Sequence, residues 1–98
     1  MEKRTPHHKL TTVKALLAAN KVSTTRAARE GAIALGFDFP DMLAVVAALV
    51  PSDFYKSMTT YADHTVWQDV YRPSTPAGDV YLKLTVVDAV LIVSFKEQ

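Results

Sequence analysis

The sequence contains no cysteine and only three glycines among its 98 residues. Without cysteine the chain forms no disulfide and no thiolate metal site, which is usual for proteins of a reducing compartment. The three glycines, at positions 31, 36 and 78, are too few and too far apart for the glycine-rich loops that bind nucleotide phosphates. Disulfide-stabilised folds and nucleotide-binding loops are therefore not expected.

Long apolar segments are also missing. The longest, MLAVVAALV at residues 42–50, is about half as long as the ~20 residues that a membrane-spanning helix needs. The first ten residues, MEKRTPHHKL, are charged and lead into no apolar segment of the signal-peptide kind. We therefore expect a cytoplasmic protein without a membrane partner, and the chain length favours a single domain over residues 1–98.

The charge is unevenly distributed, although the formal net charge is only +1. Residues 1–29 carry seven basic side chains and one acid, whereas residues 30–79 carry two basic side chains and seven acids. A basic first third fits a polyanion or an acidic protein as partner. Basic residues that only cover the solvent-facing sides of two helices would give the same pattern.

The apolar pattern changes at Pro51 from helical spacing to strand alternation. Helices are expected over residues 6–19, over residues 25–35, and from Asp38 or Phe39 to Pro51. Thr5 is a suitable N-cap for the first helix, and Ser23 or Thr24 for the second. Strands are expected at residues 54–61, 65–72, 80–87 and 90–96.

Short turns join these strands, so neighbouring strands should pair antiparallel. Helices followed by strands predict an α+β fold. We expect three N-terminal helices packed on one face of a mainly antiparallel sheet of four or more strands.

Strand alternation predicts which side chains share a face of the sheet. The even residues from Val80 to Val86 are apolar and predict a core face, and in the last strand Leu91, Val93 and Phe95 form the apolar set. The other face is expected to gather polar side chains: Lys56, Gln68, Tyr81, Lys83 and Lys96. Lysines that keep an open sheet face soluble, or that protect an edge strand from aggregation, are the alternative explanation.

Two stretches, FYKSMTTYADHTVWQDVYRP and VYLKLTVVDAVLIVSFKE, resemble the motility quorum-sensing regulator (MqsR) toxin family. The shorter matches TPH, TTR and LGFDF extend the resemblance toward the N-terminus. It implies a RelE-like ribonuclease fold and an mRNA interferase that cuts single-stranded mRNA, mostly at GCU-like triplets, without a metal or other cofactor. It also implies an antitoxin partner with a zinc-binding domain and a helix-turn-helix domain, which would link the toxin to operator DNA.

The resemblance assigns the family's proposed catalytic residues to four positions: Lys56, Gln68, Tyr81 and Lys96. We add three candidate RNA contacts: Arg72, Lys83 and Tyr55. No metal site is expected, because the adjacent His7 and His8 would not share a helix face.

RNA carries its own nucleophile, the 2′-hydroxyl, so a ribonuclease needs a base, a cation for the phosphate and an acid for the leaving oxygen. Lys56 and Lys96 on one face are expected to lower each other's pKa. The division of acid and base roles among Lys56, Lys96 and Tyr81 stays open, and we treat them as one coupled set. A non-catalytic module that binds RNA or protein, or a purely structural partner in a regulatory complex, are the rival hypotheses.

Overall fold

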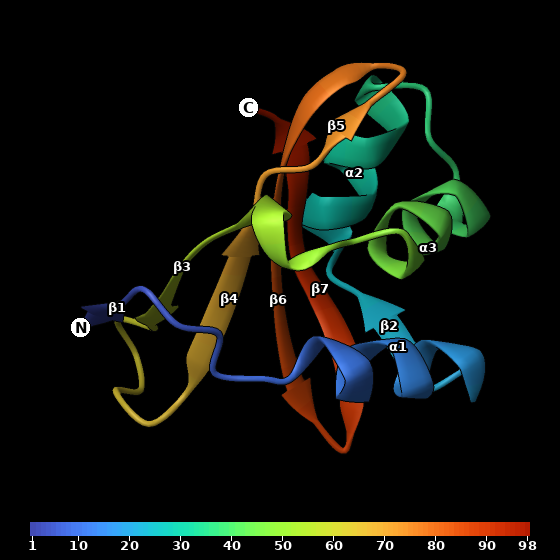
Figure 1. Ribbon diagram of the computed structural model, residues 1–98. Helices are drawn as coiled ribbons and strands as arrows, with labels where there is room; N and C mark the ends of the chain where they lie inside the picture. Colours follow the sequence, from blue (N-terminus) through green and yellow to red (C-terminus); the bar gives the residue numbers. More distant parts are fainter.

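The computed structural model describes all residues from 1 to 98 and has three helices beside an open, twisted sheet (Figure 1). The helices are α1 (Leu10–Ala18), α2 (Arg26–Ala34) and α3 (Phe39–Ala47), followed by the 3₁₀ helix η1 (Pro51–Asp53). The strands are β1 (Glu2–Lys3), β2 (Val22–Thr24), β3 (Phe54–Thr59), β4 (Trp67–Tyr71), β5 (Ser74–Thr75), β6 (Gly78–Val87) and β7 (Ala89–Glu97).

The sheet has the strand order β1-β3-β4-β6-β7-β2, and β5 pairs with β6 beside this path. Every pair is antiparallel except β2 with β7, so the predicted α+β class with a mainly antiparallel sheet is confirmed. Figure 1 shows the three helices gathered near β7 and β2, whereas β1 and β3 at the opposite end of the sheet have no helix beside them. No helix is both long and apolar enough to cross a bilayer.

The helix starts differ from the sequence prediction where other contacts hold the backbone. The first helix begins at Leu10 rather than at residue 6, because His7 and His8 form a bend whose amides are bonded to Asp69, and Lys9 is extended. Thr25, not Ser23 or Thr24, caps α2, and its hydroxyl accepts a hydrogen bond from the Ala28 amide at 3.1 Å.

The third helix begins as predicted and ends early. Asp38 is its N-cap and forms a reciprocal pair with Asp41, in which each carboxylate accepts the other residue's amide. The helix ends at Ala47, and Pro51 begins the 3₁₀ helix instead of ending α3.

The four predicted strands are present, and three short strands were not expected from the sequence: β1, β2 and β5. Strands of two or three residues contain no measurable alternation, so their pairing is decided by tertiary contacts.

Strand β7 is contacted by two consecutive elements. Strand β2 pairs with it in parallel, and α2, which follows β2 in the chain, packs against it. At Gly31 a side-chain Cβ would lie 2.0 Å from the Phe95 carbonyl oxygen, so this close approach requires glycine.

The predicted apolar face of the last strand is wrong in part, because β7 contains a β-bulge. Lys83 pairs with Ser94 and Leu84 pairs with Ile92, which leaves Val93 without a partner. The alternation therefore shifts by one residue, and the buried residues are Val90, Ile92 and Phe95 rather than Leu91 and Val93. In β6 the core positions Val80, Leu82 and Leu84 are buried as predicted.

The buried carboxylate of Asp69 on β4 anchors the N-terminal segment to the sheet. Asp69 is fully buried, and its two oxygens accept hydrogen bonds from the backbone amides of His7 at 3.0 Å and His8 at 2.9 Å. Nearby, the His7 ring stacks on Trp67, and the Lys3 ammonium lies 4.3 Å from the centre of the Trp67 ring. These contacts hold residues 1–9 against the sheet and bring β1 beside β3.

Replacing Asp69 by Asn is expected to loosen the N-terminal segment. The amide NH₂ of asparagine would face one of the two backbone N–H groups and leave a buried donor without an acceptor. We expect a loss of about 1–3 kcal/mol in unfolding free energy, measured by chemical denaturation. The His7 and His8 amides should also exchange hydrogen faster.

Asp79→Asn is the matched control, because Asp79 is an exposed carboxylate that accepts a hydrogen bond from the Ser74 hydroxyl. It should change the unfolding free energy by no more than about 0.5 kcal/mol. Equal effects of the two substitutions would contradict the anchoring role of Asp69.

Candidate functional site

The site is built on a row of residues paired across four strands. Lys56 of β3 is the partner of Val70, Val70 is the partner of Lys83, and Lys83 is the partner of Ser94. Directly paired residues project from the same face of a sheet, so Lys56 and Lys83 flank Val70. We call this side, which carries Lys56, Lys83 and Lys96, the lysine face.

Val70 is fully buried although no helix residue contributes to this row. The Lys56 side chain beside it is only 19% exposed. Long lysine stems readily cover apolar surface while the ammonium groups stay at the water boundary. On the lysine face, ammonium groups thus lie above the buried, apolar side chain of Val70.

The other predicted catalytic residues lie in the neighbouring rows. Tyr81 is the strand partner of Lys96, and the Lys96 ammonium lies 5.3 Å from the centre of the Tyr81 ring. Gln68 is the partner of Met58, which makes it a diagonal neighbour of Lys56 on the same face. The pairing register therefore brings all four predicted catalytic residues to one face.

A β-bulge at Tyr55 adds an aromatic ring to this surface. Phe54 pairs with Tyr71 and Lys56 pairs with Val70, so Tyr55 has no partner on β4. The Arg72 guanidinium lies 3.7 Å from the centre of the Tyr55 ring, a cation–π contact. Lys56 at 5.3 Å and Arg4 at 5.7 Å are the other cations near this ring.

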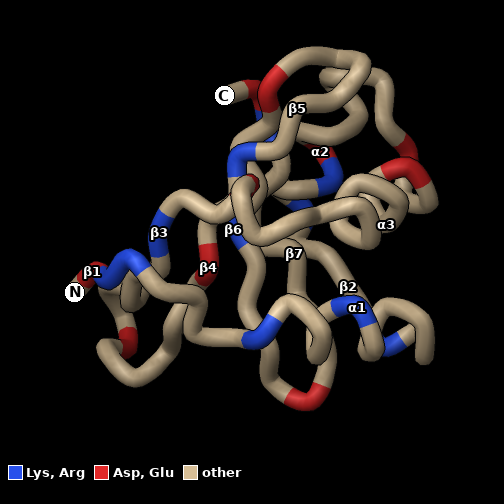
Figure 2. Tube along the Cα trace, viewed as in Figure 1, with Lys and Arg blue, Asp and Glu red and all other residues tan.

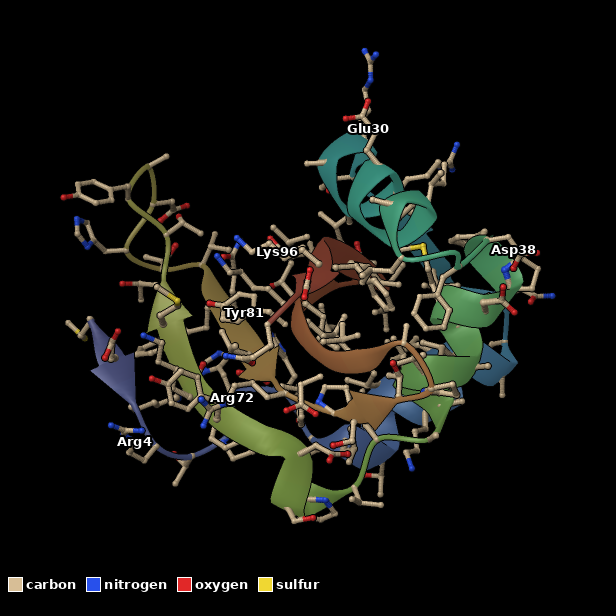
Figure 3. All side chains as sticks on the ribbon, turned by 90° about the horizontal axis from the view of Figure 1, so that it is seen from above. Arg4, Glu30, Asp38, Arg72, Tyr81 and Lys96 are labelled. Carbon is tan, nitrogen blue, oxygen red and sulfur yellow. The ribbon has the colours of Figure 1, made fainter.

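The basic side chains form a strip along the sheet. Figure 3 shows Lys96 next to Tyr81, with Arg72 and Arg4 on the same side of the molecule and Asp38 on the opposite side. Figure 2 shows basic positions on β1, β3 and β6, and acidic positions near α3, in the turns, on β1 and on β4. None of the surface hollows, whose volumes reach about 440 Å³, includes a predicted catalytic residue in its lining. An open strip of this kind suits an extended ligand better than a small enclosed one.

The lysine with a lowered pKa is Lys83, in the middle of the row. Burial lowers the pKa of Lys83 most, and the positive charges of Lys96 and then Lys56 lower it further. The pKa of Lys56 is instead raised, chiefly because its ammonium donates a hydrogen bond to the Glu2 carboxylate. The expectation that Lys56 has a lowered pKa is therefore wrong.

Two residues near the site were missed by the sequence analysis: Glu2 and Arg4. Glu2 lies on β1 and forms an ion pair with Lys56, with 2.7 Å between the Glu2 Oε1 and Lys56 Nζ atoms. Arg4 follows β1 and approaches Tyr55. No sequence signal marks them, because β1 is too short to show alternation and Glu2 lies 54 residues before Lys56 in the chain. No cluster of three or more metal-ligating side chains forms anywhere in the chain.

Comparison with known proteins identifies the family. A sequence profile described as "Motility quorum-sensing regulator, toxin of MqsA" matches residues 5–97. The chain belongs to this MqsR toxin family. A relative in Escherichia coli (strain K12), "mRNA interferase toxin MqsR", is 61% identical over 98 residues, which is 100% of each chain. The resemblance to the MqsR family is thus confirmed, while the roles of individual residues stay predictions.

Replacing Lys96 by Met is expected to raise the pKa of Lys83, because a nearby positive charge disappears. Lys56→Met should raise it as well, but by less, since Lys96 acts more strongly on Lys83 than Lys56 does. The measurement is a pH titration of the lysine side-chain signals by NMR. Lys21→Met, at an exposed position outside the site, is the control and should leave the Lys83 titration unchanged. An unchanged titration in both site variants would contradict the proximity of these ammonium groups.

Proposed function

We propose that this protein is an mRNA interferase toxin, a single-domain endoribonuclease that cleaves single-stranded mRNA in the cytoplasm. The observation that supports it most strongly is the convergence of Lys56, Gln68, Tyr81 and Lys96 on one open face. The 61% identity to a protein named as an mRNA interferase toxin supports the same activity. We further propose a RelE-like fold and a preference for GCU-like triplets, as the family resemblance implies.

The proposed reaction is an internal transesterification. The 2′-oxygen attacks the neighbouring phosphorus, the bond from phosphorus to the 5′-oxygen breaks, and the products end in a 2′,3′-cyclic phosphate and a 5′-hydroxyl. One proton must leave the 2′-hydroxyl, and one must reach the 5′-oxygen. The residues of the lysine face supply the charge and the proton transfers without a metal or cofactor.

We assign Lys56 to the scissile phosphate as a fixed cation, because its raised pKa keeps it protonated. The Tyr81 hydroxyl is the proposed proton donor to the 5′-oxygen, with the Lys96 ammonium beside its ring. Lys83, whose pKa is lowered by burial and by the charges of Lys96 and Lys56, is the proposed acceptor of the 2′-hydroxyl proton beside this coupled set. Gln68 orients the phosphate or a base edge through its amide.

The substrate is proposed to be single-stranded because the lysine face offers stacking surfaces and cations along an open strip. Unstacked bases stack on tyrosine rings and on arginine guanidinium planes. Tyr55 and Arg72 already form such a stack, and a base would lie against either of them. The same pair would serve a non-catalytic RNA-binding module, which is the competing function.

Single-stranded RNA incubated with the protein in EDTA tests the activity directly. We expect cleavage to products that end in a 2′,3′-cyclic phosphate, and no cleavage where the cut site carries a 2′-deoxy sugar. Lys56→Ala and Tyr81→Ala should each lower the rate by at least about 100-fold, the usual contribution of a charge stabiliser or a proton donor.

Lys21→Ala is the control for this assay, because Lys21 is a basic residue outside the site. Cleavage that survives in both the Lys56 and Tyr81 variants would contradict the assignment. RNA that is retained but stays intact would instead support the binding module.

A cognate antitoxin is the proposed partner, with a zinc-binding domain and a helix-turn-helix domain that connects the toxin to operator DNA. The family description, toxin of MqsA, supports this pairing. We propose that the antitoxin adds a strand at a free edge of the sheet, β1 or β2, where unpaired backbone groups are available. In the complex the amides of one of these strands should become protected from hydrogen exchange. A complex in which the partner touches only the helices would rule this arrangement out.

A further inference from the structure

The Glu2 carboxylate is bound to Lys56, the lysine that we assign to the scissile phosphate. Its Oε1 atom lies 2.7 Å from the Lys56 Nζ atom, a distance typical of a charge-assisted hydrogen bond. Glu2 is the strand partner of Met58, which lies two residues from Lys56 on the same face. The carboxylate therefore takes up one of the three hydrogen-bond donors of the ammonium group that we assign to the phosphate.

This contact follows from how the N-terminal segment is held. Strand β1 pairs with β3 at Lys3 and Ser57, and the Met1 carbonyl accepts a hydrogen bond from the Thr59 amide at 2.9 Å. The Asp69 carboxylate holds the chain after β1 through His7 and His8. Glu2 is fixed between these two attachments, and its side chain is still 55% exposed, so RNA can reach it.

Glu2 is poorly suited to act as the catalytic base. Its hydrogen bond with Lys56, and the charge of Lys56, lower the pKa of the carboxyl group, so it has little tendency to take a proton. A carboxylate beside a phosphate-binding ammonium also repels the phosphodiester. Two anions then compete for one cation.

We propose that Glu2 is a built-in counter-ion that holds Lys56 in position in the free protein and gives it up to the scissile phosphate when RNA binds. This inference rests on the proposed ribonuclease function and adds a residue to it. Glu2 is a positioning residue in this scheme, because it acts on the phosphate through Lys56. Because the phosphate must displace the Glu2 carboxylate from Lys56, the protein binds RNA more weakly than it would without Glu2.

The test measures binding, so that it does not depend on cleavage. The ligand is a single-stranded RNA with a 2′-deoxy sugar at the cut site, and its dissociation constant is determined over a range of salt concentrations. Glu2→Gln should lower the dissociation constant by about two- to fivefold, the range expected for release of one exposed ion pair. The slope of log K against log salt should steepen by up to about 0.7, because in the starting protein the freed Glu2 carboxylate beside the phosphate offsets part of the counter-ion release from one phosphate.

Glu30→Gln is the matched control for the loss of one negative charge. Glu30 forms an exposed ion pair with Arg26 on α2 and points away from the body of the protein (Figure 3). It should change neither the dissociation constant nor the salt slope to the extent of Glu2→Gln. Glu2→Asp, which keeps the carboxylate, should restore affinity toward the starting value.

A double-mutant cycle with Lys56→Gln separates the exchange from general repulsion. In that background Glu2→Gln should tighten RNA binding clearly less than it does when Lys56 is present, and an equal tightening in both backgrounds would overturn the exchange. Equal effects of Glu2→Gln and Glu30→Gln in the otherwise unchanged protein would overturn the inference, even if that protein cleaves RNA normally. Absence of cleavage together with the predicted binding changes would overturn the ribonuclease function but leave the counter-ion exchange standing.

Discussion

The pairing of β4 with its two neighbours is the constraint on which the candidate site depends. Val70 sits between Lys56 and Lys83, and a shift of either pairing by one residue would turn a lysine toward the helix side. The buried Asp69, on the opposite face of the same strand, resists such a shift because its carboxylate must meet the His7 and His8 amides. One strand thus fixes both the N-terminal segment and the row of cations.

The electrostatics of the lysine face follow from this arrangement. Burial is the main cause of the lowered pKa of Lys83, and repulsion from the ammonium groups of Lys96 and Lys56 lowers it further. An anion bound among them would relieve that repulsion. In the free protein Glu2 neutralises one of these ammonium groups, that of Lys56. A phosphodiester is a larger anion that would suit the whole strip, which also carries the contact between Tyr55 and Arg72. In the proposed function, the cleavage of RNA and its binding would therefore depend on the same cations.

Sequence alone was sufficient for the parts of the fold that repeat regularly. Alternation in residues 80–87 correctly placed Leu82 toward the core and Tyr81 away from it, and Asp38 was recognisable as a helix N-cap. The sequence did not reveal the two β-bulges, because no residue type in the sequence signals the extra residue at Tyr55 or Val93 that interrupts the alternation. It also failed at Glu2, whose contact with Lys56 depends on a two-residue strand. That the polar side chains share one face of the sheet was therefore predictable, but their protonation and their neighbours required the three-dimensional register, and their roles stay predictions.

The central claim is that side chains from β3, β4, β6 and β7 meet at one scissile phosphate. NMR mapping with a single-stranded RNA that carries a 2′-deoxy sugar at the cut site tests this most directly. We expect the side-chain signals of Lys56, Gln68, Tyr81 and Lys96 to shift together, at the same RNA concentration, while signals of α1 and α3 stay in place. Shifts confined to the helices, or spread over both faces of the sheet, would contradict the central claim.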